Sequence, residues 1–317
     1  MSKRDEVCSA LASLLKLYPA TAPKSPSPQE MIIIPSSATL TQAFQTLIDN
    51  SILSAPVYNS ETNTFIGFLD CRDLVAFCVF ASNESNWEPS LEDMINLGAK
   101  ATSVPVSNIT ASYLAKRHPF HYVYATDTLY DVAERLAQPD CHRVPVVDKT
   151  TGEMIALITQ SALIQWIFDR RDALCDVLCH RLADLGQIGS KPVISVSAST
   201  PIIDAFAVMD RHRISAVGVL SPQGDLAATT SSTDIKRFLS RRVPISQSIL
   251  SFVQSLYADS FDIRAPLICV SKSTLFDNVI GRMAQAKVHR VFVVDDTDRP
   301  VEVVSITDIV KLLVNRK

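Results

Sequence analysis

The chain has 317 residues, of which 47% are hydrophobic and 20% charged, a composition typical of a folded protein with about two ordinary domains. Thirty basic residues nearly balance 33 acidic ones, and the net charge of −3 argues against sequence-general nucleic-acid binding. Only eight glycines are present, and they form neither the dinucleotide-binding motif nor the P-loop motif. Any phosphate site must therefore be built without a glycine-rich loop.

The N-terminal 30 residues precede the regular part of the sequence. Residues 1–18 have the pattern of a short amphipathic helix, and residues 19–28 contain four prolines, which predicts an extended linker. The charged residues 3–6 do not fit a cleavable signal peptide. We expect an arm and linker over residues 1–30.

No apolar run reaches the roughly 20 residues that a membrane span requires, since even residues 74–81 form a short run. The seven cysteines are an odd number without a Cys-x-x-Cys pair, which indicates reduced, mostly buried thiols. These features predict a protein without a membrane span and with a cytoplasmic location, the nucleus being a further compartment to consider.

A pattern that recurs four times begins at Met31. Each copy has a strand-like stretch, a threonine followed by Leu or Pro, a helical segment, two more apolar runs and a second helical segment. We predict that the threonines are helix N-caps, because a hydroxyl there can accept a free backbone N–H. They are Thr39, Thr128, Thr200 and Thr274, and 34 residues after them stand Asp73, Ala162, Asp234 and Asp308.

The two apolar runs after the first helix of each copy are predicted to be buried strands. The first of them is short, rich in β-branched residues and bounded by turn residues, at positions 55–58, 144–147, 216–220 and 291–294. The second leads directly into the second helix, at positions 65–69, 154–158, 226–229 and 301–306. Each copy therefore has the order β-α-β-β-α.

This order resembles the cystathionine-β-synthase (CBS) domain, a nucleotide-sensing module that works in pairs. The resemblance implies an α+β fold in which four CBS units are paired into two modules, roughly residues 31–170 and 190–317, that form a flat disc with a central channel. We place the CBS units at residues 31–81, 118–170, 191–240 and 265–317. The connections are then residues 82–117, a helical segment over 171–190, and residues 241–264.

Four CBS units without a catalytic domain resemble the γ regulatory subunit of the AMP-activated (sucrose non-fermenting type) protein kinase. The matching words are CHRVPVVD at 141–148, RHRISA at 211–216, VHRVFVVD at 288–295 and SITD at 305–308. The resemblance implies a non-enzymatic protein with AMP, ADP or ATP as regulatory ligands. It also implies a heterotrimer with the catalytic α subunit and the β scaffold subunit of a kinase.

The same resemblance implies which residues hold the nucleotide. Ribose hydroxyls would be bound by the aspartates at the start of the second helices, namely Asp73, Asp234 and Asp308. Phosphates would be bound by His142, Arg143, Arg213, His289, Arg290, Ser305 and Thr307, since arginine and histidine are suited to anions. The adenine and backbone contacts would come from Thr200, Ile214, Ser215 and Ala216. As an alternative, the aspartates and hydroxyls only cap the helices that follow them.

Two copies depart from the family pattern. In the first copy, Leu53 takes the position of the phosphate-contacting arginine. In the second copy, Ser161 replaces a basic residue and Ala162 replaces the ribose aspartate. We therefore expect the nucleotide sites in the third and fourth copies, with His142 and Arg143 contributing from the second copy.

Two other functions fit the same sequence. The departures favour a scaffold whose nucleotide sites have decayed, and a CBS protein that regulates another enzyme or a channel is equally compatible with the repeats. We expect no catalytic residues, no metal site and no catalytic cofactor, since neither a Ser-His-Asp order nor a metal-ligand constellation stands out.

Overall fold

The computed structural model describes residues 2–26, 30–82, 106, 120–257 and 267–314. Most of the connection at 82–117 and the end of the connection at 241–264 thus lie outside the described residues. Contacts divide the chain into two compact units. Unit 1 comprises Met1–Met31, Phe120–Val193 and Ile268–Lys317, and unit 2 comprises Ile32–Pro119 and Ile194–Leu267.

Numbered along the chain, the second and fourth repeats belong to unit 1, and the first and third belong to unit 2. The compact units thus group alternate repeats, whereas the sequence led us to expect consecutive ones to be grouped. The physical reason is helix packing, because the apolar helix faces of alternate repeats cover one another. Examples are α12 (Phe276–Gln285) against α7 (Gln160–Phe168) and α3 (Cys71–Ser82) against α9 (Ile202–Arg211). Pairing of consecutive repeats through their sheets stays a prediction.

Each repeat has the predicted order β-α-β-β-α around a three-stranded sheet, in which the first two strands are parallel and the last two antiparallel. In unit 1 the elements of the second repeat are β4 (Val123–Tyr124), α6 (Leu129–Leu136), β5 (Arg143–Val147), β6 (Met154–Thr159) and α7 (Gln160–Phe168). Those of the fourth repeat are β10 (Cys269–Val270), α12 (Phe276–Gln285), β11 (Arg290–Val294), β12 (Pro300–Ser305) and α13 (Ile306–Leu313).

Unit 2 has the same arrangement. The first repeat has β1 (Ile34–Pro35), α2 (Leu40–Asp49), β2 (Ser54–Asn59), β3 (Thr64–Asp70) and α3 (Cys71–Ser82). The third has β7 (Ser195–Ser197), α9 (Ile202–Arg211), β8 (Ala216–Leu220), β9 (Leu226–Ser231), the 3₁₀ turn η3 (Ser232–Asp234) and α10 (Ile235–Ser240).

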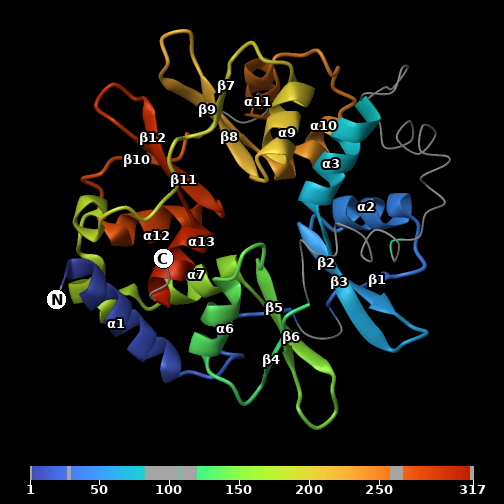
Figure 1. Ribbon diagram of the computed structural model, residues 1–317, viewed down its shortest axis with the longest axis vertical. Coiled ribbons are helices and arrows are strands. Elements are labelled where there is room, and N and C mark those ends of the chain that lie inside the picture. Colours follow the sequence, from blue (N-terminus) through green and yellow to red (C-terminus); the bar gives the residue numbers. More distant parts are fainter. Residues whose placement is uncertain (1, 27–29, 83–105, 107–119, 258–266, 315–317) are drawn as a thin grey trace. The chain divides into compact units, whose positions relative to one another are not determined.

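Helix α1 (Lys3–Lys16) is part of the core of unit 1. It buries Val7, Cys8, Leu11 and Leu15 and packs against α6 and α13, beside which it lies in Figure 1. The proline-rich segment continues along the second repeat, where Ser25 Oγ accepts a hydrogen bond from the backbone N–H of Leu157 at 2.8 Å. The N-terminal arm is thus ordered within the chain itself.

Three short helices follow the second repeat in the chain and pack within unit 1. They are η1 (Arg171–Leu174), α8 (Cys175–Leu178) and η2 (Leu182–Leu185). Their apolar side chains Leu174, Leu178, Leu182 and Leu185 are buried in the core of unit 1. Among the described residues, no helix combines the length and the apolar character needed to cross a bilayer.

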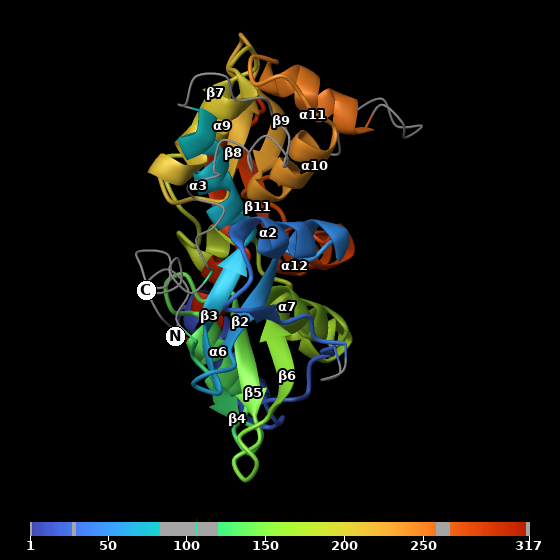
Figure 2. The ribbon, with the colours of Figure 1, turned by 90° about the vertical axis from the view of Figure 1, so that its right-hand side faces the viewer.

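Aromatic rings hold the core of unit 2. Phe206 on α9, Phe238 on α10 and Phe252 on α11 (Ile249–Tyr257) are fully buried. The ring centroids of Phe206 and Phe238 lie 5.7 Å apart and those of Phe238 and Phe252 lie 6.3 Å apart, both in edge-to-face geometry. Figure 2 shows α9, α10 and α11 together at one end of the drawing. Edge-to-face pairs of this kind stabilise a core beyond their buried area.

The helix N-caps are as predicted in the first two repeats and differ in the last two. Thr39 and Thr128 each form a capping box at α2 and α6. Helices α9 and α12 instead begin one residue later, with Pro201 and Leu275 at the N-cap position and no side-chain cap. The hydroxyl of Thr274 accepts the N–H of Ser271 at 3.1 Å, so it closes the preceding turn and is not available to the helix.

Backbone features identify the equivalent residues of the four repeats. In the turn that follows each first helix, one residue has positive φ, namely Ser51, Asp140, Arg213 and Lys287 at 54°, 57°, 54° and 53°. Three residues later the second strand begins, at Ser54, Arg143, Ala216 and Arg290. This register corrects one prediction from the sequence, which placed Leu53 at the position of the phosphate-contacting arginine. The residue of the first repeat that is equivalent to Arg143 and Arg290 is Ser54, and Leu53 is equivalent to His142.

Candidate functional site

Four basic side chains gather in unit 1, at the start of the equivalent strands β5 and β11. His142 and Arg143 come from the second repeat, and His289 and Arg290 from the fourth; all four are half-buried. Burial, together with the charges of Arg290, His142 and Arg143, lowers the pKa of His289 to about 4. The two repeats thus place their predicted phosphate-binding residues within electrostatic reach of one imidazole. We call these four residues the basic cluster.

The next part of the site is Gln160, which is only 5% exposed. Its Nε2 donates to the backbone carbonyls of Leu136 at 2.9 Å and Cys141 at 3.3 Å. The same amide lies 3.0 Å (Nε2) and 3.2 Å (Oε1) from the hydroxyl of Thr307 in the fourth repeat. Its Oε1 is 3.4 Å from Nδ1 of His142. Gln160 therefore joins a predicted phosphate-binding residue of each repeat.

Asp308 lies at the start of α13, directly after Thr307. Its Oδ2 accepts hydrogen bonds from the hydroxyl of Ser305 at 2.6 Å and from the backbone N–H of Ser305 at 2.8 Å, and the Ser305 hydroxyl in turn caps the helix. Within the described part of the chain, its Oδ1 accepts no hydrogen bond. The helix-capping role of Asp308 thus uses Oδ2 alone among the described residues.

The two remaining aspartates lie in unit 2. Asp234 Oδ2 accepts hydrogen bonds from the Thr230 hydroxyl at 3.1 Å and the Ser231 N–H at 2.8 Å. Burial raises the pKa of Asp234 against the effect of these hydrogen bonds. Asp73 is 2% exposed, and its Oδ2 accepts the backbone N–H of Asp70 at 2.9 Å. Both carboxylates therefore bind the turn that precedes their helix, as Asp308 does.

The predicted backbone and arginine contacts of the third repeat also belong to unit 2. Ser215 is equivalent to His142 and His289, because its carbonyl accepts the N–H of Ser232 at 2.9 Å as theirs accept Gln160 and Ile306. Ile214 and Ala216 flank Ser215, and Thr200 lies before α9. The exposed Arg213 is two residues before Ser215, and its carbonyl accepts the guanidinium of Arg72 at 3.1 Å.

The second strands of unit 2 begin with Ser54 and Ala216, so the residues equivalent to Arg143 and Arg290 carry no charge there. In unit 2, a contact comparable to that of Gln160 is made by Lys236. Its Nζ donates to the carbonyls of Leu47, at 3.2 Å, and Ile52. These carbonyls are the equivalents of Leu136 and Cys141, which Gln160 binds in unit 1. The phosphate-binding chemistry predicted from the sequence is therefore concentrated in unit 1.

Sequence reasoning missed Gln160 and Lys236. Both are polar residues at positions where other repeats have smaller or apolar side chains, such as Cys71 and Ile306 for Gln160, and Val75 and Val310 for Lys236. Comparing the four repeats position by position would have singled out these two residues. The spacing alone could not reveal their roles, because Thr307, which Gln160 contacts, and both partners of Lys236 come from another repeat.

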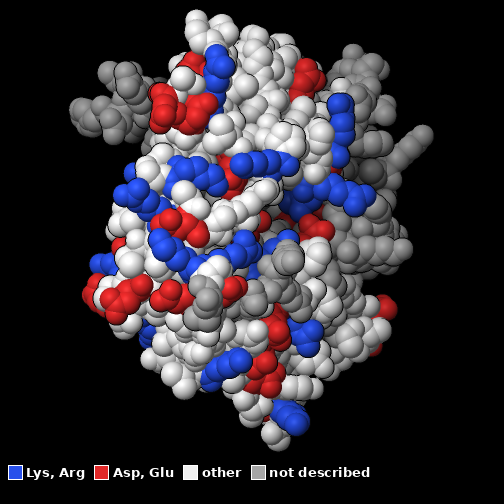
Figure 3. Space-filling view, turned by 60° about the vertical axis from the view of Figure 1, so that its left-hand side comes forward, with Lys and Arg blue, Asp and Glu red and all other residues white. Residues whose placement is uncertain are grey.

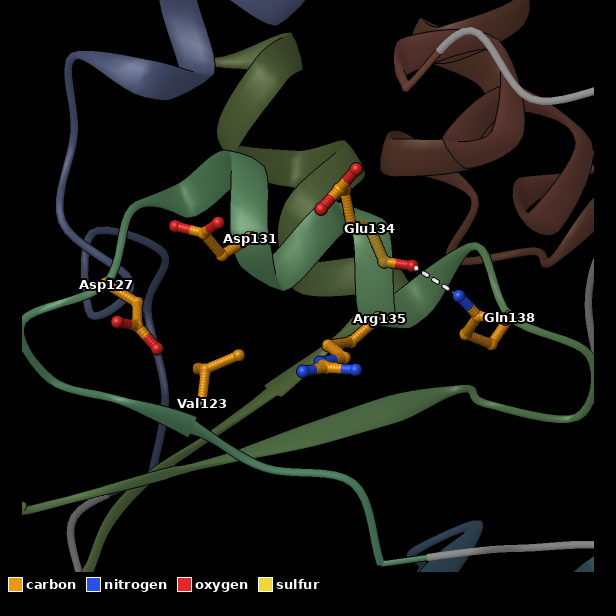
Figure 4. A pocket seen from close by; sticks show the side chains of 6 residues that line it. All are labelled: Val123, Asp127, Asp131, Glu134, Arg135 and Gln138. Atoms are coloured by element: carbon orange, nitrogen blue, oxygen red, sulfur yellow. Dashed lines mark hydrogen bonds between the residues drawn. The ribbon is translucent and has the colours of Figure 1, made fainter.

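A separate hollow lies between β4 and α6 of the second repeat, with a volume of about 220 Å³. Figure 4 shows its lining, Val123, Asp127, Asp131, Glu134, Arg135 and Gln138. Its carboxylates serve local structure, since Asp131 completes the capping box of α6 and Asp127 accepts the N–H of Tyr124 at 2.8 Å. On the face drawn in Figure 3, acidic and basic side chains are interspersed, without an extended patch of one sign.

Four β-α-β-β-α repeats, two of which carry a histidine-arginine pair at equivalent strand starts, define a protein built from tandem copies of one small α+β domain. Residues 27–79, 111–169, 185–241 and 260–315 each match the CBS domain family, and the chain belongs to that family. It is 25% identical over 297 residues to the γ subunit of 5'-AMP-activated protein kinase from Saccharomyces cerevisiae, with 91% of this chain and 88% of the yeast protein covered. The resemblance to γ subunits is thereby confirmed.

Two further similarities complete the comparison. The chain is 26% identical over 318 residues to Protein SDS23 of Kluyveromyces lactis, which covers 90% of this chain and 60% of that protein. The crystal structure of a proposed archaeal homolog of g-AMPK from Methanocaldococcus jannaschii has a TM-score of 0.65 at 17% identity, covering 92% of this chain and 98% of the archaeal one. The latter similarity concerns the fold alone.

Proposed function

We propose that this protein is a non-catalytic, γ-type regulatory subunit that binds adenine nucleotides and modulates a heterotrimeric Ser/Thr protein kinase. The observation that carries the proposal is the basic cluster, in which Arg290 of the same repeat and His142 and Arg143 of another repeat all act on His289. Several basic side chains close together favour the binding of an anion, because each of them interacts favourably with its negative charge. A nucleotide phosphate is the anion that fits a CBS protein similar to kinase γ subunits.

In this proposal each group of the site has a distinct role. Arg143 and Arg290 bind phosphate oxygens as permanent cations, and the Thr307 hydroxyl donates to the same anion. The oxygen Oδ1 of Asp308 accepts a ribose hydroxyl, while Oδ2 keeps α13 capped. In unit 2, Asp234 with the backbone of Ile214, Ser215 and Ala216 forms a second candidate for ribose and adenine.

The partners in this proposal are the catalytic α subunit and the β scaffold subunit of the kinase. Exchange of AMP or ADP for ATP changes the charge at the basic cluster. A bound nucleotide can change kinase activity only if its affinity differs between two states of the complex. Pull-down of α and β subunits with the full chain, followed by assay of the complex with each nucleotide, tests this part.

Titration calorimetry of the full chain with AMP, ADP and ATP tests the binding site. We expect Arg143→Ala and Arg290→Ala each to weaken AMP binding about 10- to 100-fold, the usual effect of removing a charge-assisted hydrogen bond. Arg299→Ala is the matched control, because Arg299 lies at the far end of the β11–β12 hairpin from Arg290. Wild-type protein that binds none of the three nucleotides at millimolar concentration contradicts the proposal.

A scaffold with decayed nucleotide sites is the second candidate, and unit 2 favours it. Ser54 and Ala216 replace the arginines there, and the carboxylates of Asp73 and Asp234 bind their own turns. The substitution Asp308→Ala separates the two candidates. A sensor loses nucleotide-dependent regulation of the bound kinase, whereas a scaffold keeps both its complex and its activity.

A further inference from the structure

We propose that Gln160 is the positioning residue of the phosphate site, holding the Thr307 hydroxyl and the His142 ring in the orientations that an anion needs. The inference rests on the proposed function and adds a residue that the resemblance does not assign. Gln160 is buried, lies at the first position of α7 and contacts groups from both repeats of unit 1.

The orientation of the amide follows from its surroundings. Two backbone carbonyls, of Leu136 and Cys141, face Nε2 at 2.9 and 3.3 Å. Reversing the amide would place Oε1 against both carbonyls, which cannot donate. Nε2 is therefore fixed toward the end of α6 and Oε1 toward His142, while the Thr307 hydroxyl lies within hydrogen-bond distance of both atoms.

This orientation determines the state of His142. Since Oε1 of Gln160 only accepts hydrogen bonds, the ring nitrogen 3.4 Å from it, Nδ1, must carry the proton. Nε2 of the neutral ring then has a lone pair, and it becomes a donor to an anion when the ring is protonated. Gln160 thus selects the tautomer of His142.

The same amide gives the Thr307 hydroxyl two alternative arrangements. Without an anion, the hydroxyl can donate to Oε1 at 3.2 Å. When a phosphate oxygen is present, the hydroxyl can turn its proton to the phosphate and accept from Nε2, which lies at 3.0 Å. An apolar side chain of the same length offers neither arrangement and leaves the carbonyl of Leu136 without this donor.

Histidine-selective ¹⁵N NMR of the full chain tests the tautomer without any ligand. We expect the Nδ1–H form for His142 in the wild type, assigned by loss of its signals in His142→Gln, and its conversion to the Nε2–H form in Gln160→Met. Wild-type His142 in the Nε2–H form overturns the proposal even if Gln160→Met does not fold.

Calorimetric titration with AMP tests the role in binding. Gln160→Met should weaken AMP binding about tenfold, and Thr307→Val should do the same. The double variant should lose little more than either single variant, because the two side chains act as one unit. Gln165→Met is the matched control on α7, since Gln165 is exposed and bonds only Asp169. Affinity within twofold of wild type in Gln160→Met overturns the proposal, whereas wild-type protein that fails to bind AMP contradicts the proposed function instead.

Discussion

The backbone N–H of Gly189 donates to Oε1 of Glu302 at 2.9 Å, which fixes the segment before the third repeat to the last sheet of unit 1. The Glu302 side chain is 0% exposed and also forms ion pairs with Lys272 at 2.5 Å and Lys191 at 3.5 Å. Burial alone would raise the pKa of Glu302, but these partners outweigh it and lower the pKa. These partners compensate the buried negative charge of Glu302, so that removing one of them should lower the free energy of unfolding.

Gly189→Ala should destabilise unit 1 strongly. A Cβ at this position would lie 2.1 Å from the carbonyl oxygen of Val303, a backbone atom that cannot move without breaking the hydrogen bonds between Ser190 and Val303. We expect a loss of more than about 2 kcal/mol in the free energy of unfolding, measured by urea denaturation. Ser190→Ala keeps those backbone bonds and should stay within about 0.5 kcal/mol of wild type; an equal effect of both substitutions would argue against the steric explanation.

Lys236→Met should destabilise unit 2. The ammonium group of Lys236 binds the carbonyls of Leu47 and Ile52 from another repeat, and burial lowers the pKa of Lys236. Loss of its hydrogen bonds should cost about 1–2 kcal/mol, seen as a lower midpoint in thermal unfolding. Arg237→Met changes the exposed neighbour on the same helix and serves as control. A Lys236→Met protein as stable as the control would contradict a role in joining the repeats.

Leu11→Ala should show that helix α1 belongs to the core. Leu11 is fully buried against unit 1, and removing a buried leucine side chain costs about 2–5 kcal/mol. Leu17 is 78% exposed, and Leu17→Ala should change stability by less than about 0.5 kcal/mol. Chemical denaturation of both variants makes the comparison. Two small effects would mean that α1 does not stabilise the unit.

Acid should destabilise unit 1 through His289. An unfolded chain protonates this histidine near its ordinary pKa of about 6.5, whereas the folded protein does so only at about 4. Between these values the unfolded state binds more protons, so stability decreases as pH falls from about 6.5 to about 4, by roughly 2–3 kcal/mol in all. Unfolding measured across this range should lose most of that slope in His289→Gln and keep it in His212→Gln, since His212 is exposed on unit 2.

Several local features could be predicted from the sequence because their causes are local. The repeat, the strands and the capping roles of Thr39 and Thr128 depend on spacing and on residue chemistry within a few positions. The N-cap assignment of Thr274 was wrong because its hydroxyl has a competing local donor, the N–H of Ser271. The one-residue error at Leu53 had a similar origin, since strand register is set by the partner strand and is not visible in one segment.

The sequence by itself determined the four β-α-β-β-α repeats and the residue types suited to bind an anion, because periodicity and side-chain chemistry are properties of each segment. Only the tertiary structure decided which repeats share a core, and therefore that Arg143 and Arg290 both act on His289, whereas Ser54 and Ala216 begin the equivalent strands in unit 2. It also revealed Gln160, whose partners are 24 and 147 residues away. Contacts of that separation depend on the packing of apolar helix faces, which many segments could satisfy equally well and only the folded chain selects.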